Sequence, residues 1–333
     1  MFTHSYLTLI LSSNGRDLDI LINKCEIGFN PISSDDNILV YKKYFMQPNF
    51  FIVGGAKCAT TNISYYLNEH PDVFIPELNE PYYYCRFDVP KNFNRSSMIT
   101  DKKKYLKLFK NANHKAIGEA TPVYLQCPHS ALEIKKDYPD SKIIISIRNP
   151  IDKAHSSYFS YKFMNLDKRS FSEKIDLFEE QHKNGEFFIF NFIEDGFFSK
   201  HIKRYQKLFP SKNIKIIFFE EYIKNIPMHI NSLFNFLEIY EPIELTVQPK
   251  NSFRIPRNNI AEFLLKSSTF RNIATKLIPV IQRDKLGERF FVKQSQKPPM
   301  LIEDRKRLKK IFSSEYEDLK QLLGIAPPWS DFQ

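Results

Sequence analysis

Hydrophobic and polar positions along the chain fall into blocks whose lengths separate strands from helices. Short apolar runs, rich in β-branched or aromatic residues, occur at 50–53, 142–147 and 214–219, and each is long enough for a buried strand. Segments with helical character lie between or after them, at 101–111, 130–137, 196–208, 228–237 and 302–323. Strands that alternate with helices form a mostly parallel sheet covered by helices. The pattern therefore predicts an α/β fold.

The periodic pattern begins at residue 49, which predicts a division of the chain into two parts. Residues 1–48 form an N-terminal extension with short apolar patches at 18–21 and 38–41, which are candidate strands. Residues 49–333 are predicted to form one domain. Within it, 165–185 is polar and irregular and predicts a loop facing the substrate.

The first predicted strand runs into a loop that has the residues of a phosphate-binding turn. A glycine pair ends the strand, and Lys57 precedes two threonines and a helix-like segment at 63–67. Backbone N–H groups at a helix N-terminus, the helix dipole and a lysine together attract an anion. The candidate phosphate-binding residues are Gly55, Ala56, Lys57, Cys58, Ala59, Thr60, Thr61 and Asn62.

This loop differs from a Walker A loop at the positions next to its lysine. The Walker motif has glycine immediately before the lysine and Ser or Thr immediately after it. Here Ala56 and Cys58 occupy those places, so the hydroxyl that would bind Mg²⁺ is missing. The loop predicts a phosphate-like group bound without a metal. From this segment alone, an ordinary strand–turn–helix with a solvated lysine remains the alternative.

A second anion-binding pattern follows the strand predicted at 142–147. Arg148 comes directly after the strand, Pro150 suits a helix start, and Ser156 lies about two turns into that helix. Ligands of open α/β sheets bind outside the carboxyl ends of the strands. An arginine there offers a planar, permanently charged fork for a phosphate. Two strand ends, distant in sequence, thus carry phosphate-binding chemistry.

Together these two patterns resemble the motifs of sulfotransferases that use 3′-phosphoadenosine 5′-phosphosulfate (PAPS), in the carbohydrate, heparan-type and bacterial branch. The loop 55–61 resembles the family's 5′-phosphosulfate loop, usually K-x-G-T-[ST], with Ala59 in place of the usual glycine. The segment 148–156 resembles the 3′-phosphate motif, R-[DN]-P followed by a serine. The resemblance covers residues 49–329 and implies a P-loop-like, three-layer fold with a central sheet flanked by helices.

Weaker matches occur in the order in which the family has them. Residues 67–73 resemble L-x-x-H-P-x-[VI], residues 79–84 resemble K-E-[PV]-[HY]-[FY]-[FY], and residues 118–125 resemble G-E-[AK]-[ST]-P-x-Y. Residues 297–300 and Trp329 resemble the terminal region of bacterial members. Heparan-type members have a lysine within the third motif, at the position of Ala120 in this chain. This difference argues against a heparan-like substrate specificity.

The resemblance implies transfer of a sulfuryl group from PAPS to a hydroxyl or amine of an acceptor, in line and without a metal. It implies that Lys57 stabilises the leaving phosphate and that Glu80 is the base, next to an aromatic triplet expected to line the acceptor cleft. A carbohydrate is the expected acceptor. His155 and His129 are rival bases, because small-molecule sulfotransferases use a histidine.

The resemblance also implies which residues bind the nucleotide. Arg148 and Ser156 are expected at its 3′-phosphate, and Lys297 is expected to reach it, with Lys293 as the alternative. Residues 249–300, rich in Lys, Arg, Asn and Pro, are expected to fold over it. Glu119 is expected to hold a lysine or arginine in the cleft.

Composition and charge fit this interpretation. The 333 residues carry a net charge of +10, and a basic surface favours anionic partners, although much of such charge serves solubility. The four cysteines are widely spaced, with no C-x-x-C pair that would indicate zinc or redox chemistry. Cys58 is either a thiol with a lowered pKa beside Lys57 or an inert loop thiol.

Two other classes of function are alternatives to a sulfotransferase. A nucleotide kinase or other P-loop NTPase would need a Walker loop and an acidic metal ligand at a strand end. A non-catalytic polyanion-binding protein would not need the nucleotide constellation, and no nucleic-acid-binding module is recognisable.

The apolar run at 6–11 is too short to span a membrane. A soluble, cytoplasmic, bacterial-type enzyme is expected, with membrane association through its substrate as the alternative.

Overall fold

The computed structural model describes residues 9–12, 29–31, 38–43, 47–86, 88, 97–163, 169–183, 191–241, 243–247, 254–267 and 290–333. The chain forms two compact units, Met1–Gln47 and Pro48–Gln333. In the smaller unit, β1 (Leu9–Ser12), β2 (Phe29–Pro31) and β3 (Ile38–Lys43) form an antiparallel sheet in the order β1-β3-β2. The patch predicted at 38–41 lies in β3, whereas the patch at 18–21 lies outside the described residues.

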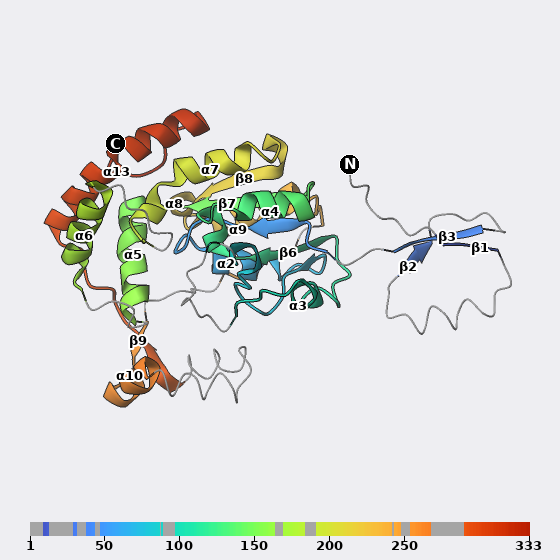
Figure 1. Ribbon diagram of the computed structural model, residues 1–333, viewed down its shortest axis with the longest axis horizontal. Coiled ribbons are helices and arrows are strands. Elements are labelled where there is room, and N and C mark those ends of the chain that lie inside the picture. Colours follow the sequence, from blue (N-terminus) through green and yellow to red (C-terminus); the bar gives the residue numbers. More distant parts are fainter. Residues whose placement is uncertain are drawn as a thin grey trace. The chain divides into compact units, whose positions relative to one another are not determined.

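The larger unit is built on a five-stranded parallel sheet (Figure 1). Its strands are β4 (Phe50–Ile52), β5 (Val73–Phe74), β6 (Ala116–Ala120), β7 (Lys142–Ile147) and β8 (Ile214–Phe218). Their order is β5-β6-β4-β7-β8, so β4, the first strand of this sheet along the chain, lies at the centre between β6 and β7. Later strands of the chain lie on both sides of β4, so the order of the strands reverses there. A reversal of this kind opens a crevice at the carboxyl ends of the strands, where ligands bind.

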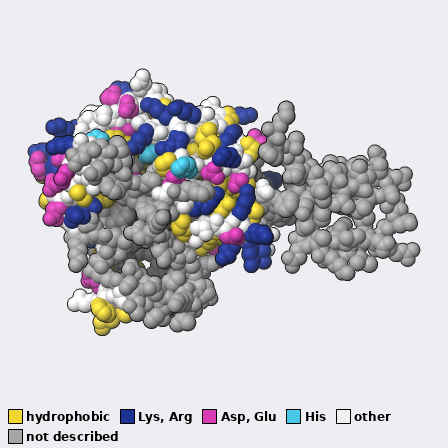
Figure 2. Space-filling model, in the orientation of Figure 1, with side chains coloured by type: hydrophobic (Ala, Val, Ile, Leu, Met, Phe, Trp, Pro, Cys, Tyr) yellow, Lys and Arg dark blue, Asp and Glu magenta, His cyan; other side chains and the backbone are white. Residues whose placement is uncertain are grey.

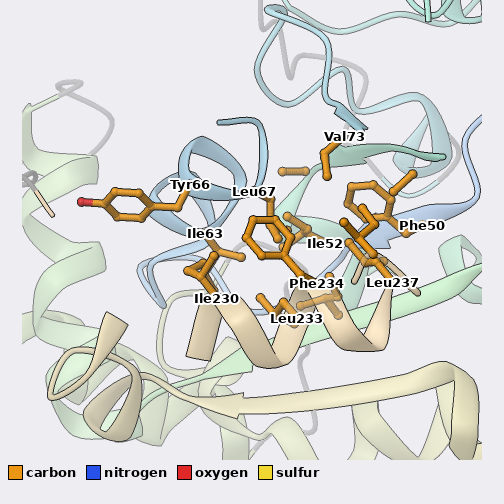
Figure 3. Packing of buried hydrophobic residues seen from close by; sticks show 14 of the residues in the cluster. Phe50, Ile52, Ile63, Tyr66, Leu67, Val73, Ile230, Leu233, Phe234 and Leu237 are labelled. Atoms are coloured by element: carbon orange, nitrogen blue, oxygen red, sulfur yellow. The ribbon is translucent and has the colours of Figure 1, made fainter. Parts of the chain in front are cut away.

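Two helices cover one face of this sheet. Helix α2 (Thr60–Leu67) packs beside α9 (Ile226–Phe236), and both contribute to a buried apolar cluster with β4 and β7. Figure 3 shows Leu233 and Phe234 of α9 beside Ile63 and Ile52. Ile230, Leu233 and Phe234 lie at helical spacing on one face of α9, so burial of that face stabilises the helix.

A second apolar cluster joins three helices. It unites α5 (Pro150–Phe163), α6 (Phe171–Lys183) and α13 (Ile302–Leu323) through residues such as Ile151, Ile175 and Phe312. Helix α7 (Phe198–Gln206) also packs against α13. The arrangement of helices around the central sheet in Figure 1 confirms the predicted α/β, P-loop-like fold.

The remaining elements are short. They are η1 (Tyr83–Cys85), α3 (Lys102–Lys107), η2 (Pro122–Leu125), α4 (Ser130–Asp137), η3 (Glu194–Gly196), η4 (Ser211–Asn213), α8 (Phe219–Tyr222), β9 (Arg254–Pro256), α10 (Asn259–Lys266) and β10 (Val292–Gln294).

One prediction of local structure is wrong. The segment 165–185, expected to be an irregular loop, contains helix α6 over most of its length. Phe171, Ile175 and Phe178 recur at spacings of four and three and are buried on one face, while polar residues cover the rest. The high polar content of the segment hid this narrow apolar stripe.

Candidate active site

The phosphate-binding loop joins the carboxyl end of β4 to α2 and is held against β7. A Cβ atom on Gly54 would lie 2.0 Å from the backbone nitrogen of Ser146, so only glycine permits this approach. The hydroxyl of Ser146 donates to the carbonyl of Cys58, and the Val53 N–H donates to the Ile144 carbonyl at 3.0 Å. The loop is therefore fixed on the sheet by β7.

Two residues of this loop adopt the left-handed conformation that favours glycine. Lys57 has φ 66°, and Ala59, which caps the N-terminus of α2, also has φ 66°. Ala59 stands where the family usually has glycine, and its backbone nevertheless takes the glycine-like conformation. Such conformations cost free energy in residues with a Cβ atom and concentrate at functional sites.

The hydroxyls, amide and thiol of the loop point in different directions. Thr61 is exposed, whereas Thr60 and Asn62 are buried, and the Asn62 side-chain oxygen accepts a hydrogen bond from the Tyr222 hydroxyl. Cys58 is fully buried, and burial raises the pKa of its thiol to about 12 despite nearby positive charges. Of the two alternatives for Cys58, burial favours the inert loop thiol.

Arg148 connects the two phosphate motifs. Its Nη1 donates to the carbonyl of Lys57 at 3.2 Å, and its guanidinium lies 4.1 Å from the centre of the Phe219 ring. Its buried Nε has no hydrogen-bond partner among the residues that the structure describes. A buried donor without a partner is unfavourable, and an anion at this site could accept from it.

Asn149, next to Arg148, is held by residues that the sequence analysis did not identify. Its N–H donates to Glu220 Oε1 at 2.9 Å, its amide nitrogen donates to Asp331 Oδ2 at 2.7 Å, and its side-chain oxygen accepts from Ile151 N–H at 3.0 Å. The indole of Trp329 donates to the other Glu220 oxygen at 3.0 Å. The C-terminal segment thus fixes the 3′-phosphate motif, and only the position of Trp329 in the family's terminal region hinted at it.

Lys297 lies close to the positive charges of both motifs. Burial lowers the pKa of its ammonium group, and the positive charges of Arg148 and Lys57 lower it further. Lys297 is partly buried, whereas Lys293, the alternative considered from the sequence, is exposed on β10. Three cations from three separate segments therefore gather at the carboxyl ends of β4 and β7.

Ser156 and His155 lie on adjacent positions of α5. Ser156 is partly exposed. His155 packs between Phe159 and Phe171, with ring centres 5.0 and 5.1 Å away. Burial lowers the pKa of His155 to about 4, and the charge of Lys297 acts in the same direction. The imidazole of His155 is therefore neutral at pH 7.

Glu80 lies in a turn with unusual backbone geometry. Glu80 has φ 54° and Tyr82 has φ 56°, both left-handed, and the Tyr82 hydroxyl donates to Glu80 Oε2 at 2.6 Å. The aromatic triplet was expected to line an acceptor cleft, but Tyr82, Tyr83 and Tyr84 are all at least 97 % buried. Tyr83 stacks on Tyr105 of α3, with ring centres 4.4 Å apart. The triplet packs the turn against the domain instead.

Glu119 on β6 is held by hydroxyl groups rather than by the expected lysine or arginine. The hydroxyls of Thr121, Tyr105 and Tyr124 donate to its carboxylate at 2.7, 2.8 and 3.0 Å. Burial raises the pKa of Glu119 to about 7, although these hydrogen bonds favour the charged form. Tyr124 also accepts from the Tyr84 N–H, so this network anchors the Glu80 turn to the sheet.

The other histidines considered from the sequence have structural contacts. His129 is largely exposed, and its Nδ1 and backbone N–H lie within hydrogen-bond distance of the Asp88 carboxylate. His70 is buried, and its Nδ1 accepts from the Asp72 N–H at 3.0 Å. Its Nε2 lies 2.9 Å from the Glu241 carbonyl. His70 thus connects two loops.

Lysine and arginine side chains do not form one separate patch on the face shown in Figure 2, where acidic side chains lie among them. The net positive charge therefore does not by itself locate an acceptor. Among the helices that the structure describes, none has the length and apolar character to cross a bilayer.

Comparison with known proteins identifies the family. The family model described as "Sulfotransferase domain" matches residues 47–321. The crystal structure of a sulfotransferase from Alicyclobacillus acidocaldarius is 25 % identical, covers 84 % of this chain and 96 % of that chain, and has a TM-score of 0.62. The chain belongs to the sulfotransferase family, which is the family that its motifs resemble.

Two curated relatives match shorter parts of this chain. The membrane-associated sulfotransferase kil1 of Dictyostelium discoideum is 29 % identical over 132 residues, which are 39 % of this chain and 27 % of that protein. Carbohydrate sulfotransferase 15 of Mus musculus is 21 % identical over 269 residues, covering 63 % of this chain and 48 % of that protein. The chain thus matches less than half the length of each of these two relatives.

Proposed function

We propose that residues 49–333 transfer a sulfuryl group from PAPS to a hydroxyl or amine of a carbohydrate acceptor. The observation that carries this proposal is the gathering of Lys57, Arg148 and Lys297 at adjacent strand ends. Burial is the main cause of the lowered pKa of Lys297, and repulsion from Arg148 and Lys57 lowers this pKa further. A ligand with phosphate groups at both its 3′ and 5′ positions would relieve this repulsion.

The nucleotide would lie across the two motifs. Arg148 and Ser156 bind the 3′-phosphate, because a fixed guanidinium fork and a hydroxyl suit a dianion. The loop 55–62 binds the 5′-phosphosulfate with backbone N–H groups at the start of α2. The exposed Thr61 hydroxyl donates a hydrogen bond to this group. The buried Asn62 side chain instead supports the loop by accepting a hydrogen bond from the Tyr222 hydroxyl. Lys297, in the segment after β10, also binds the nucleotide.

The transfer itself needs charge stabilisation and a base. Lys57 neutralises the charge that develops on the leaving phosphate as the sulfur–oxygen bond breaks, so its effect is larger in the transition state. Glu80 takes the proton of the acceptor during in-line attack. The Tyr82 hydroxyl holds the Glu80 carboxylate in one orientation. The step needs no metal, because a sulfuryl group carries less charge than a phosphoryl group.

A carbohydrate is the proposed acceptor for two reasons. The mouse relative is named a carbohydrate sulfotransferase, and the turn around Glu80 resembles the base motif of heparan-type members more than the histidine of small-molecule enzymes. His155 is a poor rival in its present setting, because it is mostly buried between two phenylalanine rings.

A transfer assay with labelled PAPS and a panel of glycans and small alcohols tests the proposal. We expect label on a glycan and release of adenosine 3′,5′-bisphosphate. Glu80→Gln should lower kcat about 10²–10⁴-fold, the usual contribution of a general base, with nucleotide affinity unchanged. Glu77→Gln, an exposed glutamate of the same loop, is the matched control and should leave kcat unchanged.

Two results would contradict the assignment. Failure of the wild type to bind adenosine 3′,5′-bisphosphate would overturn the nucleotide site. Near-normal turnover in Glu80→Gln, with loss of turnover but intact nucleotide binding in His155→Ala, would show that the histidine is the base.

A further inference from the structure

Two buried cysteines from distant parts of the sequence meet beneath the Glu80 turn. Cys85 ends η1, Cys127 follows η2, and their Sγ atoms lie 2.7 Å apart although the residues are 42 positions apart. Both side chains are completely buried, and both are free thiols in the structure. Unbonded carbon atoms attract each other best at roughly 3.5–4.0 Å, and sulfur is larger than carbon. The Sγ–Sγ distance is therefore shorter than the optimal separation of two unbonded sulfur atoms.

Hydrogen bonds on both sides hold the two backbones in place. Ser130 donates to the Tyr84 carbonyl at 2.8 Å, and the Tyr84 N–H donates to the Tyr124 hydroxyl at 3.2 Å. On the other side, Arg204 donates to the Cys127 carbonyl at 3.2 Å. Because these contacts do not involve the sulfur atoms, the fold itself brings the two cysteines together.

We propose that Cys85 and Cys127 form a disulfide that ties the Glu80 turn to the segment after β6. The oxidant is a small-molecule disulfide such as oxidised glutathione. One cysteine thiolate attacks it, forming a mixed disulfide and releasing one glutathione thiol. The second cysteine, as thiolate, then attacks the mixed disulfide, forms the Sγ–Sγ bond and releases the second glutathione thiol. The two protons go to solvent and then to the released thiolates, so atoms and electrons balance.

Burial determines when this bond forms. A thiolate is the attacking species, and burial raises the pKa of the Cys85 thiol well above its usual range. The bond therefore forms while the chain folds, before the turn closes over the sulfur atoms, and resists reductants afterwards. Cys58 is also buried but touches neither of the other two described cysteines, so it remains a thiol and is an internal reference.

The bond also bears on the compartment. Structural disulfides persist in oxidising compartments and are rare in the cytosol. A Cys85–Cys127 disulfide would therefore be at odds with the cytoplasmic location expected from the sequence. The existence of the bond does not depend on the proposed reaction, whereas its effect on the Glu80 turn rests on that proposed function.

Peptide mapping tests the bond directly. The full chain is reduced, unfolded and refolded in a glutathione redox buffer, and remaining thiols are alkylated after denaturation. We expect one linked peptide pair containing Cys85 and Cys127, with Cys58 alkylated. Full alkylation of Cys85 and Cys127 in protein that has refolded, as judged by a cooperative thermal transition, would overturn the proposal.

A cysteine double variant and a nucleotide-binding measurement distinguish the test of the disulfide from the test of the proposed reaction. The thermal midpoint of oxidised wild type should exceed that of protein refolded with dithiothreitol, whereas Cys85→Ala/Cys127→Ala should show no such difference. Equal midpoints for wild type under both conditions would overturn the proposal. Binding of adenosine 3′,5′-bisphosphate, measured on each sample, should be the same in all of them. Loss of that binding in wild type would contradict the proposed reaction and leave the disulfide result intact.

Discussion

Ala59 offers a sharp test of how the phosphate-binding loop is built. Its φ of 66° lies in the region that glycine adopts without cost. The change Ala59→Gly removes the Cβ atom that makes this conformation unfavourable. The backbone of the loop should keep its shape, because Lys57 and the first turn of α2 are unaltered, and nucleotide affinity should therefore be unchanged.

Three contributions set the expected magnitude. A left-handed conformation costs an L-residue about 1–2 kcal/mol, which the change recovers. Glycine gains conformational freedom in the unfolded chain, which costs about 0.4–1 kcal/mol. The Ala59 methyl group is partly buried against the apolar cluster under α2, and its loss costs part of the ~0.8 kcal/mol assigned to a buried CH₂ group. The net result is a small stabilisation of roughly 0.5 kcal/mol.

The same substitution elsewhere should have the opposite sign. Ala131 is fully buried within α4, in the right-handed helical conformation. Ala131→Gly should destabilise the domain by up to about 1.3–1.8 kcal/mol, because glycine weakens a helix by about 0.5–1 kcal/mol and the buried methyl group, worth ~0.8 kcal/mol, is lost. Urea unfolding of both variants, compared at constant slope m, measures the difference. Equal destabilisation in the two variants would refute a strained Ala59.

Three further predictions concern the nucleotide, metals and pH. Arg148→Ala should weaken adenosine 3′,5′-bisphosphate binding by about 10–150-fold in calorimetry, the effect of a charged hydrogen bond, and equal wild-type affinity for adenosine 5′-phosphosulfate and PAPS would contradict this role. Sulfuryl transfer should survive EDTA, because Cys58 occupies the position of a metal-binding hydroxyl; complete loss that metal restores would indicate an NTPase-like site. Glu119 binds a proton in the folded state up to about pH 7 that the unfolded chain releases above about pH 4.5, so stability should fall as pH rises between these values. Urea unfolding of Glu119→Gln across this range should show a shallower fall, and a slope equal to that of wild type would contradict the raised pKa.

Features that depend on local patterns could be predicted from the amino-acid sequence alone. The helices predicted at 130–137 and 302–323 and the strand predicted at 142–147 have the same bounds in the structure, because each has an unbroken apolar face or run. The phosphate loop and the arginine motif were recognisable for a similar reason. Each is a short stretch in which a strand end, a turn and a helix start are adjacent in the chain.

Contacts between side chains that are distant in the sequence depend on the packing of the folded chain. Arg148 reaches the carbonyl of Lys57, 91 positions earlier, because β7 lies beside β4 in the sheet. Lys297, which follows β10, also interacts with these charges, whereas Lys293 is exposed on β10. Burial of the tyrosine triplet, the hydroxyl groups around Glu119 and the Cys85–Cys127 contact also depend on packing between distant segments. Hydrophobic periodicity specifies the faces of single elements, but strand order and helix packing specify their neighbours, and the chemistry of this site depends on those neighbours.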